Sequence, residues 1–332
     1  MSRIEFLSPQ FHYSFGPHEP KISISSGTSL RVICPDCDNV MSDGTALHAD
    51  QRDLNDPVSP IQGNPLAGPI SVDGAVRGDT LAVTIDSIEL DRASGITLLA
   101  PNHGVVPGDL LVSIAGDGDL WPAVVPRHMY HWQIDKVAGN ATIINPLGES
   151  RLSVPLNPFV GCIGVCPLNS MFVSSLHCGS FGGNLDLPMI RKGATVFLPV
   201  NQDGALLMIG DVHAAQGHGE IIGGGIETSG TIDCTIRIIK RPTIGICALW
   251  DGQQVTAIGA HDDVRQSIQQ ACGGLVNWLA QVGDVNRFDL YNAVSQVVTI
   301  TIGNLNKPPY PAAASVRLSD LPDSLVNALQ RW

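Results

Sequence analysis

Hydrophobic and polar residues alternate along several short segments of the chain, a pattern that predicts β-strands. In the segment 231–238, every second residue from Ile232 to Ile238 is apolar and would face one side of a sheet. Residues 81, 83 and 85 alternate in the same way after the turn at 77–79. Further short apolar runs predict strands at 22–24, 30–34, 69–72, 195–200, 206–209, 245–250 and 297–302.

Helical periodicity begins only near the C-terminus. Apolar residues recur at spacings of three and four from Val264 to Leu279, and the preceding Asp262 and Asp263 suit a helix N-cap. Two shorter helices are predicted at 288–294 and from Pro322 to about residue 329. The chain is therefore predicted to be mainly β (a β-rich α+β fold), with compact, barrel-like sheets and a few late helices. Residues 1–332 form one unit, or two closely packed halves without a visible boundary.

Composition and charge exclude several classes of protein. The 332 residues are 44% hydrophobic and carry a formal charge of −12, which argues against nucleic acid or an anionic membrane as partner. No apolar run reaches the roughly 18–20 residues of a membrane span, and the first residues show no export signal. Eight cysteines are too few for a disulfide scaffold of this length. We expect free thiols and a cytoplasmic location.

The densest group of polar residues lies between Gly210 and Glu220, directly after the apolar run 206–209. A strand that ends in a glycine-flanked loop carrying Asp211, His213, His218 and Glu220 is a good place for a site. Asp, His and Glu side chains are ligands suited to Zn²⁺ or a related cation. A polar turn with solvated side chains explains the segment equally well, because its spacing matches no standard metal motif.

A second candidate segment is 182–186, in which Asn184 and Asp186 would share a face of an extended chain and could bind an amide or a metal. Taken alone, a glycine turn is the better interpretation. The third, Cys34–Cys37, is a weak zinc or redox motif because no matching Cys-x-x-Cys follows, and the carboxylate of Asp36 is of more interest.

Two further groups admit both a functional and a structural interpretation. His48 and Asp50 could supply ligands, although an exposed turn accounts for them as well. Cys166 could be a nucleophile, but a lone cysteine in apolar surroundings is more often an inert core residue.

Together these segments resemble the acetamidase/formamidase family in order and spacing from residue 22 to about 302. The most specific part is 197–217, continued by Gly219–Glu220 and 225–228. Segments 161–167 and 182–186 precede it, and 64–70, 72–75 and 78–81 lie nearer the start. His218 departs from the pattern, because the family commonly has Asp there, and Cys166 stands where a small residue is common.

The resemblance implies a mainly β fold and hydrolysis of a small carboxamide, linear or cyclic, to ammonia or an amine and the carboxylic acid. We therefore expect an amidohydrolase that acts on C–N bonds other than peptide bonds. The family also implies a homo-oligomer and an association with metal. No nucleic acid or membrane partner is expected beside the small amide substrate.

We place a divalent cation, Zn²⁺ with Ca²⁺ or another ion as alternative, between Asp36, Asp186 and His213. Asp211 is a supporting catalytic residue or an alternate ligand. These residues lie in the glycine-bounded segments that match the family best.

Glu220 is the candidate general base and later proton donor, with Glu227 in reserve for the same role. Asn184, Gly183 and Gln216 are the candidate substrate-binding residues. Rival hypotheses are covalent catalysis by Cys166, a non-catalytic protein that binds metal or a small molecule in the same pocket, and, least well supported, a scaffold protein.

Overall fold

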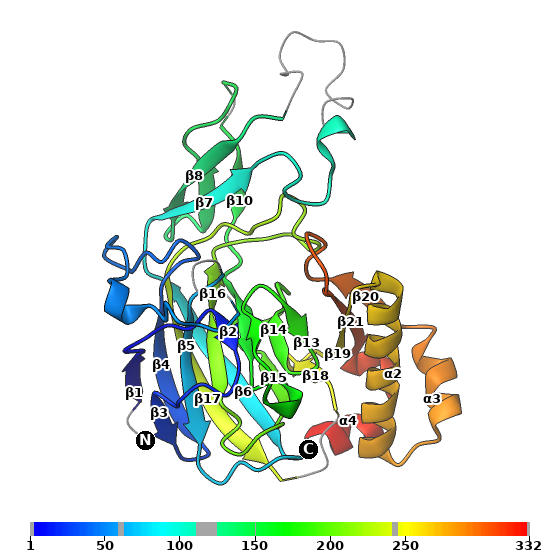
Figure 1. Ribbon diagram of the computed structural model, residues 1–332. Coiled ribbons are helices and arrows are strands. Elements are labelled where there is room, and N and C mark those ends of the chain that lie inside the picture. Colours follow the sequence, from blue (N-terminus) through cyan, green and yellow to red (C-terminus); the bar gives the residue numbers. More distant parts are fainter. Residues whose placement is uncertain (1–2, 59–62, 111–124, 150, 241–244, 331–332) are drawn as a thin grey trace.

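The computed structural model describes residues 3–58, 63–110, 125–149, 151–240 and 245–330 (Figure 1). Strands dominate, as predicted, and the largest sheet has nine of them. Their order is β1 (Ile4–Leu7), β4 (Thr28–Cys34), β17 (Gly230–Ile239), β6 (Thr80–Leu90), β15 (Thr195–Pro199), β18 (Cys247–Trp250), β19 (Gln254–His261), β21 (Tyr310–Arg317) and β20 (Thr299–Ile302).

Smaller sheets complete the β-structure. A six-stranded sheet has the order β13 (Cys178–Gly179), β14 (Gly182–Asn184), β11 (Phe159–Gly164), β16 (Leu207–His213), β5 (Leu66–Val72) and β3 (Ile22–Ile24). A four-stranded sheet of β10 (Ser153–Pro155), β9 (Asn140–Ile143), β8 (His128–Asp135) and β7 (Ser94–Leu99) projects beyond the main body in Figure 1. β12 (Val173–Ser174) pairs with β2 (Ser14–Phe15).

The main core lies between the nine-stranded and six-stranded sheets. On β17, Ile232, Cys234 and Ile236 are fully buried in this core, which confirms the alternation read from the sequence. β15 is buried on both faces, because Val196 belongs to the main core whereas its neighbour Phe197 packs into a second core under the helices.

The helices α2 (Val264–Gly283), α3 (Arg287–Val294) and α4 (Asp323–Gln330) lie near the C-terminus, as predicted, and α2 packs on β19 and β21. The predicted N-cap is confirmed for Asp263, whose side chain accepts hydrogen bonds from the backbone N–H groups of Arg265 and Gln266. Short 3₁₀ turns are η1 (Ala49–Gln51), η2 (Leu168–Ser170) and η3 (Leu318–Asp320). In the described ranges, no helix has the length and apolar character needed to cross a membrane.

One boundary was wrong in a way that matters for the site. The strand predicted at 206–209 continues as β16 to His213, so Asp211 and His213 lie on a strand and not in the loop after it. The sequence did not predict this continuation, because a glycine such as Gly210 interrupts the alternating pattern of a strand. The strand pairs with β11 through Val212 opposite Val160 and Gly210 opposite Cys162.

Candidate active site

The six-stranded sheet brings together three of the residues singled out in the sequence. Asp211 and His213 come from β16, and Asp186 follows β14 on the other side of β11. One potential ligand atom of each residue lies within 4.8 Å of the other two, and all three side chains are buried. We call this group the carboxylate–histidine cluster.

The backbone holds the acidic side chains of the site in an uncommon conformation. Asp186, Asp211 and Glu220 have φ values of 44°, 62° and 48°, in the left-handed region that favours glycine. A non-glycine residue in this region costs about 1–3 kcal/mol and persists where the surrounding structure enforces it. Such outliers gather at functional sites, so their coincidence with the buried carboxylates supports a functional role.

Gly161, on β11, lies beneath the cluster and makes its close packing possible. A Cβ atom at this position would lie 2.5 Å from Asp211 Oδ2, 2.7 Å from Asp186 Oδ1 and 2.9 Å from His213 Cε1. These separations are shorter than real Cβ contacts, so a side chain at position 161 would displace the cluster.

Hydrogen bonds orient each carboxylate but leave part of the cluster unsatisfied. Asn304 Nδ2 donates to Asp186 Oδ2 at 2.9 Å, and Cys162 Sγ lies 3.4 Å from Asp211 Oδ2. His213 Nε2 lies 2.9 Å from Glu227 Oε1 and 3.5 Å from Asp211 Oδ1. Asp186 Oδ1 and His213 Nδ1 are buried and have no hydrogen-bond partner among the described residues.

Burial and mutual repulsion raise the pKa values of the carboxyl groups in the site. Burial, followed by the charge of Asp211, raises the pKa of Asp186 to about 7. Burial also raises the pKa of Asp211 to about 6 and that of Glu227 to about 8. For Glu220, burial and the charges of Asp186, Glu227 and Asp211 raise the pKa well above its ordinary value. The positive charge of Lys307, which also lines the cavity, acts in the opposite direction on Asp211 and Glu220, but the net effect of the site is to raise these pKa values.

A cavity of about 230 Å³ opens above the cluster. Its floor includes Asp211, His213, Glu220 and Glu227, and Asn184 lies in its wall. The apolar lining residues are Ile96 and Leu98 of β7, Met129 of β8, and Leu176 in the turn between β12 and β13. The arrangement can hold a small molecule with a polar group toward the acidic floor.

Of the predicted substrate-binding residues, Asn184 is oriented toward such a role. Its Oδ1 atom accepts hydrogen bonds from Asn64 Nδ2 at 3.2 Å and from Cys162 Sγ at 2.9 Å. The amide N–H₂ group of Asn184 has no acceptor among the described residues and remains available as a donor in the cavity wall.

The other two predicted substrate-binding residues lie outside the lining of this cavity. Gly183 pairs through its backbone with Ile163 and Cys178 in the sheet. Gln216 donates to the backbone carbonyl of Asp186 at 3.0 Å and so braces the turn that carries this carboxylate.

Asp36 is placed apart from Asp186 and His213, with which it was expected to share a cation. Its carboxylate forms an ion pair with Arg92 and accepts the backbone N–H groups of Asp38 and Val40 at 3.0 and 2.8 Å. Asp211, the alternate ligand, occupies the place beside Asp186 and His213 instead.

The remaining candidates from the sequence lie away from the cluster or turn outward. His48 and Asp50 are exposed, and so is His218, the departure from the family pattern. Cys166 does not line the cavity, and its Sγ donates to Gln202 Oε1 at 3.3 Å. Burial raises the pKa of this thiol to about 11, which is unfavourable for a nucleophile.

Sequence reasoning missed Gly161, Cys162 and Asn304. The segment that contains Gly161 and Cys162 was part of the family resemblance, but neither residue was assigned a role. Asn304 lies 118 positions from Asp186, its hydrogen-bond partner, and has no local motif that could reveal the contact.

The strand-rich fold that carries the carboxylate–histidine cluster has the same architecture as solved acetamidases. Acetamidases from Bacillus halodurans and Yersinia enterocolitica superpose with TM-scores of 0.75 and 0.77, at 25% and 26% identity. The alignments cover 96% of this chain and 98% and 92% of those chains.

The acetamidase/formamidase family model matches residues 176–297, which include all three residues of the carboxylate–histidine cluster. A putative formamidase of Schizosaccharomyces pombe is 48% identical over 274 residues, covering 70% of this chain and 65% of that protein. These matches confirm the resemblance to the acetamidase/formamidase family that the sequence motifs indicated. It spans less than two thirds of the curated relatives that it matches, at 65% and 66% of their lengths.

Proposed function

We propose that this chain hydrolyses the C–N bond of a small carboxamide, linear or cyclic, and releases ammonia or an amine and the carboxylic acid. This proposal rests mainly on one observation: Asp211, His213 and Glu220 line one cavity, and Asp186 lies beside Asp211 and His213 in the carboxylate–histidine cluster. The names of the relatives, formamidase and acetamidase, favour the same reaction class.

A divalent cation fits the carboxylate–histidine cluster. Asp186 Oδ1 is buried without a partner, and burial together with repulsion raises the pKa of both aspartates. A cation held by Asp186, Asp211 and His213 would balance these charges, and the mixed nitrogen and oxygen donors favour Zn²⁺ over Ca²⁺. When bound, the ion would lower the pKa of a water molecule and polarise the carbonyl group.

The chain's own residues supply the proton transfers and the orientation of the substrate. Glu220 takes a proton from the attacking water and gives it to the leaving nitrogen as the C–N bond breaks. Burial raises the pKa of Glu220, and this makes the carboxylate a stronger proton acceptor than an exposed glutamate. Asn184 donates from its amide N–H₂ group to the carbonyl oxygen and stabilises the negative charge that develops there.

The test is ammonia release from formamide, acetamide, propionamide and a γ-lactam panel, before and after chelation and metal add-back. Glu220→Gln should lower kcat at least about 100-fold, the scale of general acid–base catalysis, and leave the metal content unchanged. Gln202→Glu, a change remote from the cavity lining, is the matched control. A Glu220→Gln enzyme with near-normal kcat would remove Glu220 from this role, and turnover that survives chelation would remove the cation.

Two other expectations remain predictions. We propose that the chain forms a homo-oligomer in the cytoplasm. Light scattering on the purified protein and fractionation of the source cells measure these two properties directly.

A further inference from the structure

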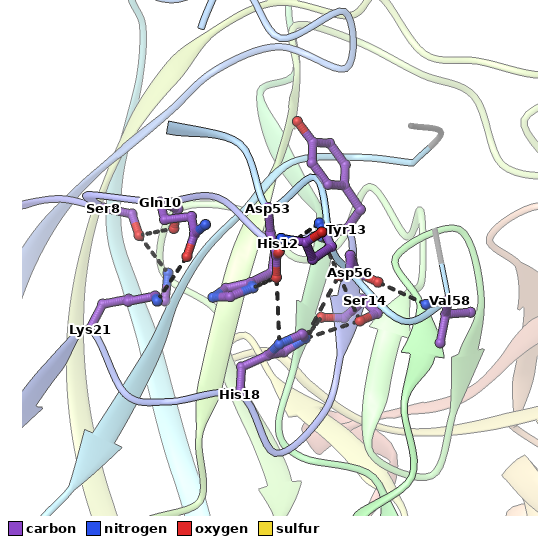
Figure 2. Close-up of polar contacts among 12 residues, drawn as sticks. Ser8, Gln10, His12, Tyr13, Ser14, His18, Lys21, Asp53, Asp56 and Val58 are labelled. Atoms are coloured by element: carbon purple, nitrogen blue, oxygen red, sulfur yellow. Dashed lines mark hydrogen bonds and ion pairs between the residues drawn. The ribbon is translucent and has the colours of Figure 1, made fainter. Parts of the chain in front are cut away.

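A second group of histidine and aspartate side chains lies outside the candidate active site, near the N-terminus. His12 and His18 flank β2, whereas Asp53 and Asp56 follow η1 (Figure 2). One nitrogen or carboxylate oxygen of each residue lies within 4.8 Å of the others. We call these four residues the N-terminal cluster.

The donor atoms of the N-terminal cluster lie close together on side chains that are at most 15% exposed. His12 Nδ1 lies 2.7 Å from Asp53 Oδ2, and His18 Nδ1 lies 3.9 Å from the same oxygen. The imidazole rings stack with their centroids 3.9 Å apart. Ligands of a tetrahedral zinc ion with bonds of about 2.1 Å are about 3.4 Å apart, so the observed separations bracket the required value.

The hydrogen bonds of Ser14 establish which nitrogen of His18 carries hydrogen. Ser14 Oγ donates to Asp56 Oδ2 at 2.8 Å, so this hydroxyl oxygen can only accept from the ring. His18 Nε2 lies 3.0 Å from Ser14 Oγ and 3.1 Å from the Ser14 backbone oxygen, which is also an acceptor. Nε2 must therefore be the donor.

The consequence is an unsatisfied lone pair on the other nitrogen. In the neutral imidazole, a hydrogen on Nε2 leaves Nδ1 without one and with a free lone pair. Figure 2 shows this nitrogen directed at the carboxylate of Asp53, and the 3.9 Å separation is too long for a hydrogen bond. The His18 side chain is only 7% exposed. A lone pair and a carboxylate that face each other in a buried place are stabilised by a cation between them.

The two carboxylates are held in place by other groups, as metal ligands usually are. Asp56 Oδ2 accepts the backbone N–H of Tyr13 at 3.0 Å in addition to the Ser14 hydroxyl. Asp53 Oδ1 accepts the backbone N–H of Asn55 at 3.1 Å, which leaves Oδ2 facing the histidines. No Lys or Arg side chain of the described residues lies within 4.0 Å of Asp53.

We propose that His12, His18, Asp53 and Asp56 form a second, structural binding site for a first-row divalent transition metal such as Zn²⁺. Two imidazoles and two carboxylates form a mixed nitrogen and oxygen donor set that suits such ions and is less suited to Ca²⁺ or Mg²⁺. The hydrogen that now joins His12 to Asp53 moves to Nε2 of His12, which has no partner among the described residues. His12 Nδ1 then becomes a ligand.

The site fastens the N-terminal segment to the loop that borders the active-site cavity. Tyr13, between the two sides of the cluster, donates its hydroxyl to Asn39 and receives a hydrogen bond from Arg52 Nε at 3.0 Å. Asn39 lies two residues after Cys37, which lines the cavity. A metal bound here closes a loop of about 40 residues and stabilises the folded state without taking part in the reaction.

The test counts Zn²⁺ per chain by elemental analysis and isothermal titration calorimetry on chelator-treated protein after readdition of metal. Wild type should bind two ions, and His18→Gln and Asp53→Asn should each bind one. His48→Gln, which alters an exposed histidine of the same region, is the matched control and should still bind two. Asp186→Asn removes a ligand of the carboxylate–histidine cluster, and this variant should keep the ion of the N-terminal cluster.

These variants separate the second site from the cation of the proposed function. The N-terminal site is supported if the Asp186→Asn protein keeps one ion and the double variant Asp186→Asn/His18→Gln keeps none. This conclusion holds whatever the two proteins show in the amide assay. Zinc counts that are equal in wild type, His18→Gln and Asp53→Asn would overturn the inference, as would the absence of zinc from Asp186→Asn. Circular dichroism checks that each variant folds. If His18→Gln does not fold, the second measurement is the absorption spectrum of Co²⁺ bound to the Asp186→Asn protein. Its Co²⁺ bands should disappear when Asp53→Asn is added to the same chain.

Discussion

Gly161→Ala tests whether the carboxylate–histidine cluster depends on the close approach of β11. The added methyl group would meet Asp211 Oδ2 at 2.5 Å and Asp186 Oδ1 at 2.7 Å, whereas ordinary contact begins at 3.4 Å. The two oxygens must therefore withdraw by about 0.9 and 0.7 Å, or β11 must move by a similar distance.

Such a displacement affects activity and stability to different extents. Overpacking of a buried site costs about 1–3 kcal/mol of folding stability, which a domain of this size can survive. A misplacement of about 1 Å at reacting groups lowers the rate about 100-fold. We expect Gly161→Ala to fold with a reduced Tm, to lose most of its bound metal and to lose at least about 100-fold in kcat/KM for the best amide substrate.

The assay combines amide turnover, metal content and thermal unfolding on the same preparations. Gly217→Ala is the matched control, because a Cβ at this exposed position would meet no atom within 4 Å. If Gly161→Ala keeps wild-type kcat/KM and metal content, the cluster does not require this packing, and the placement of the reaction at these carboxylates is refuted.

Three further predictions concern the buried carboxyl groups, the cap of α2 and Cys166. In chelated protein, the pKa of Glu227 is raised from 4.5 to about 8 and that of Asp186 to about 7. The folded state therefore binds more protons than the unfolded state between these pKa values. The free energy of unfolding should accordingly fall as the pH rises from about 5 to 8. A Tm that increases over this range would contradict the burial of these groups. Asp263→Ala removes the cap of α2 and should cost about 1 kcal/mol in chemical denaturation, with unchanged activity. Cys166→Ser should keep normal kcat, because Cys166 lies outside the cavity lining, and loss of turnover would revive the covalent hypothesis.

The strand-rich class and the late helices could be predicted because local patterns carry them. Alternation on β17 and the three–four spacing on α2 each reflect a face that must be buried. The segment 254–261, which forms β19, was not predicted, and the chain gave no alternation clear enough to separate it from its surroundings. The resemblance to the acetamidase/formamidase family is confirmed by the match over residues 176–297.

The sequence could indicate which segments carry the candidate site, whereas it could not predict the full set of residues in contact. Asp186, Asp211 and His213 stand in motifs that the sequence makes visible, and the sheet brings them together. Asp36 was expected to join them because it ends a strand in a matched segment, but its carboxylate faces Arg92. Strand order decides such contacts, and β4 and β16 belong to different sheets, which no spacing along the chain reveals.

The cavity takes its floor and part of its wall from different sheets. β16 carries Asp211 and His213, whereas Ile96 and Leu98 come from β7 and Met129 from β8, in the sheet that projects from the body in Figure 1. Substitutions in the projecting sheet can therefore change which molecules fit without moving the ionisable groups. Proteins with this fold can therefore differ in ligand preference through substitutions in the projecting sheet, while the ionisable residues on the other sheet stay the same. For an engineer, the projecting sheet is the part to randomise.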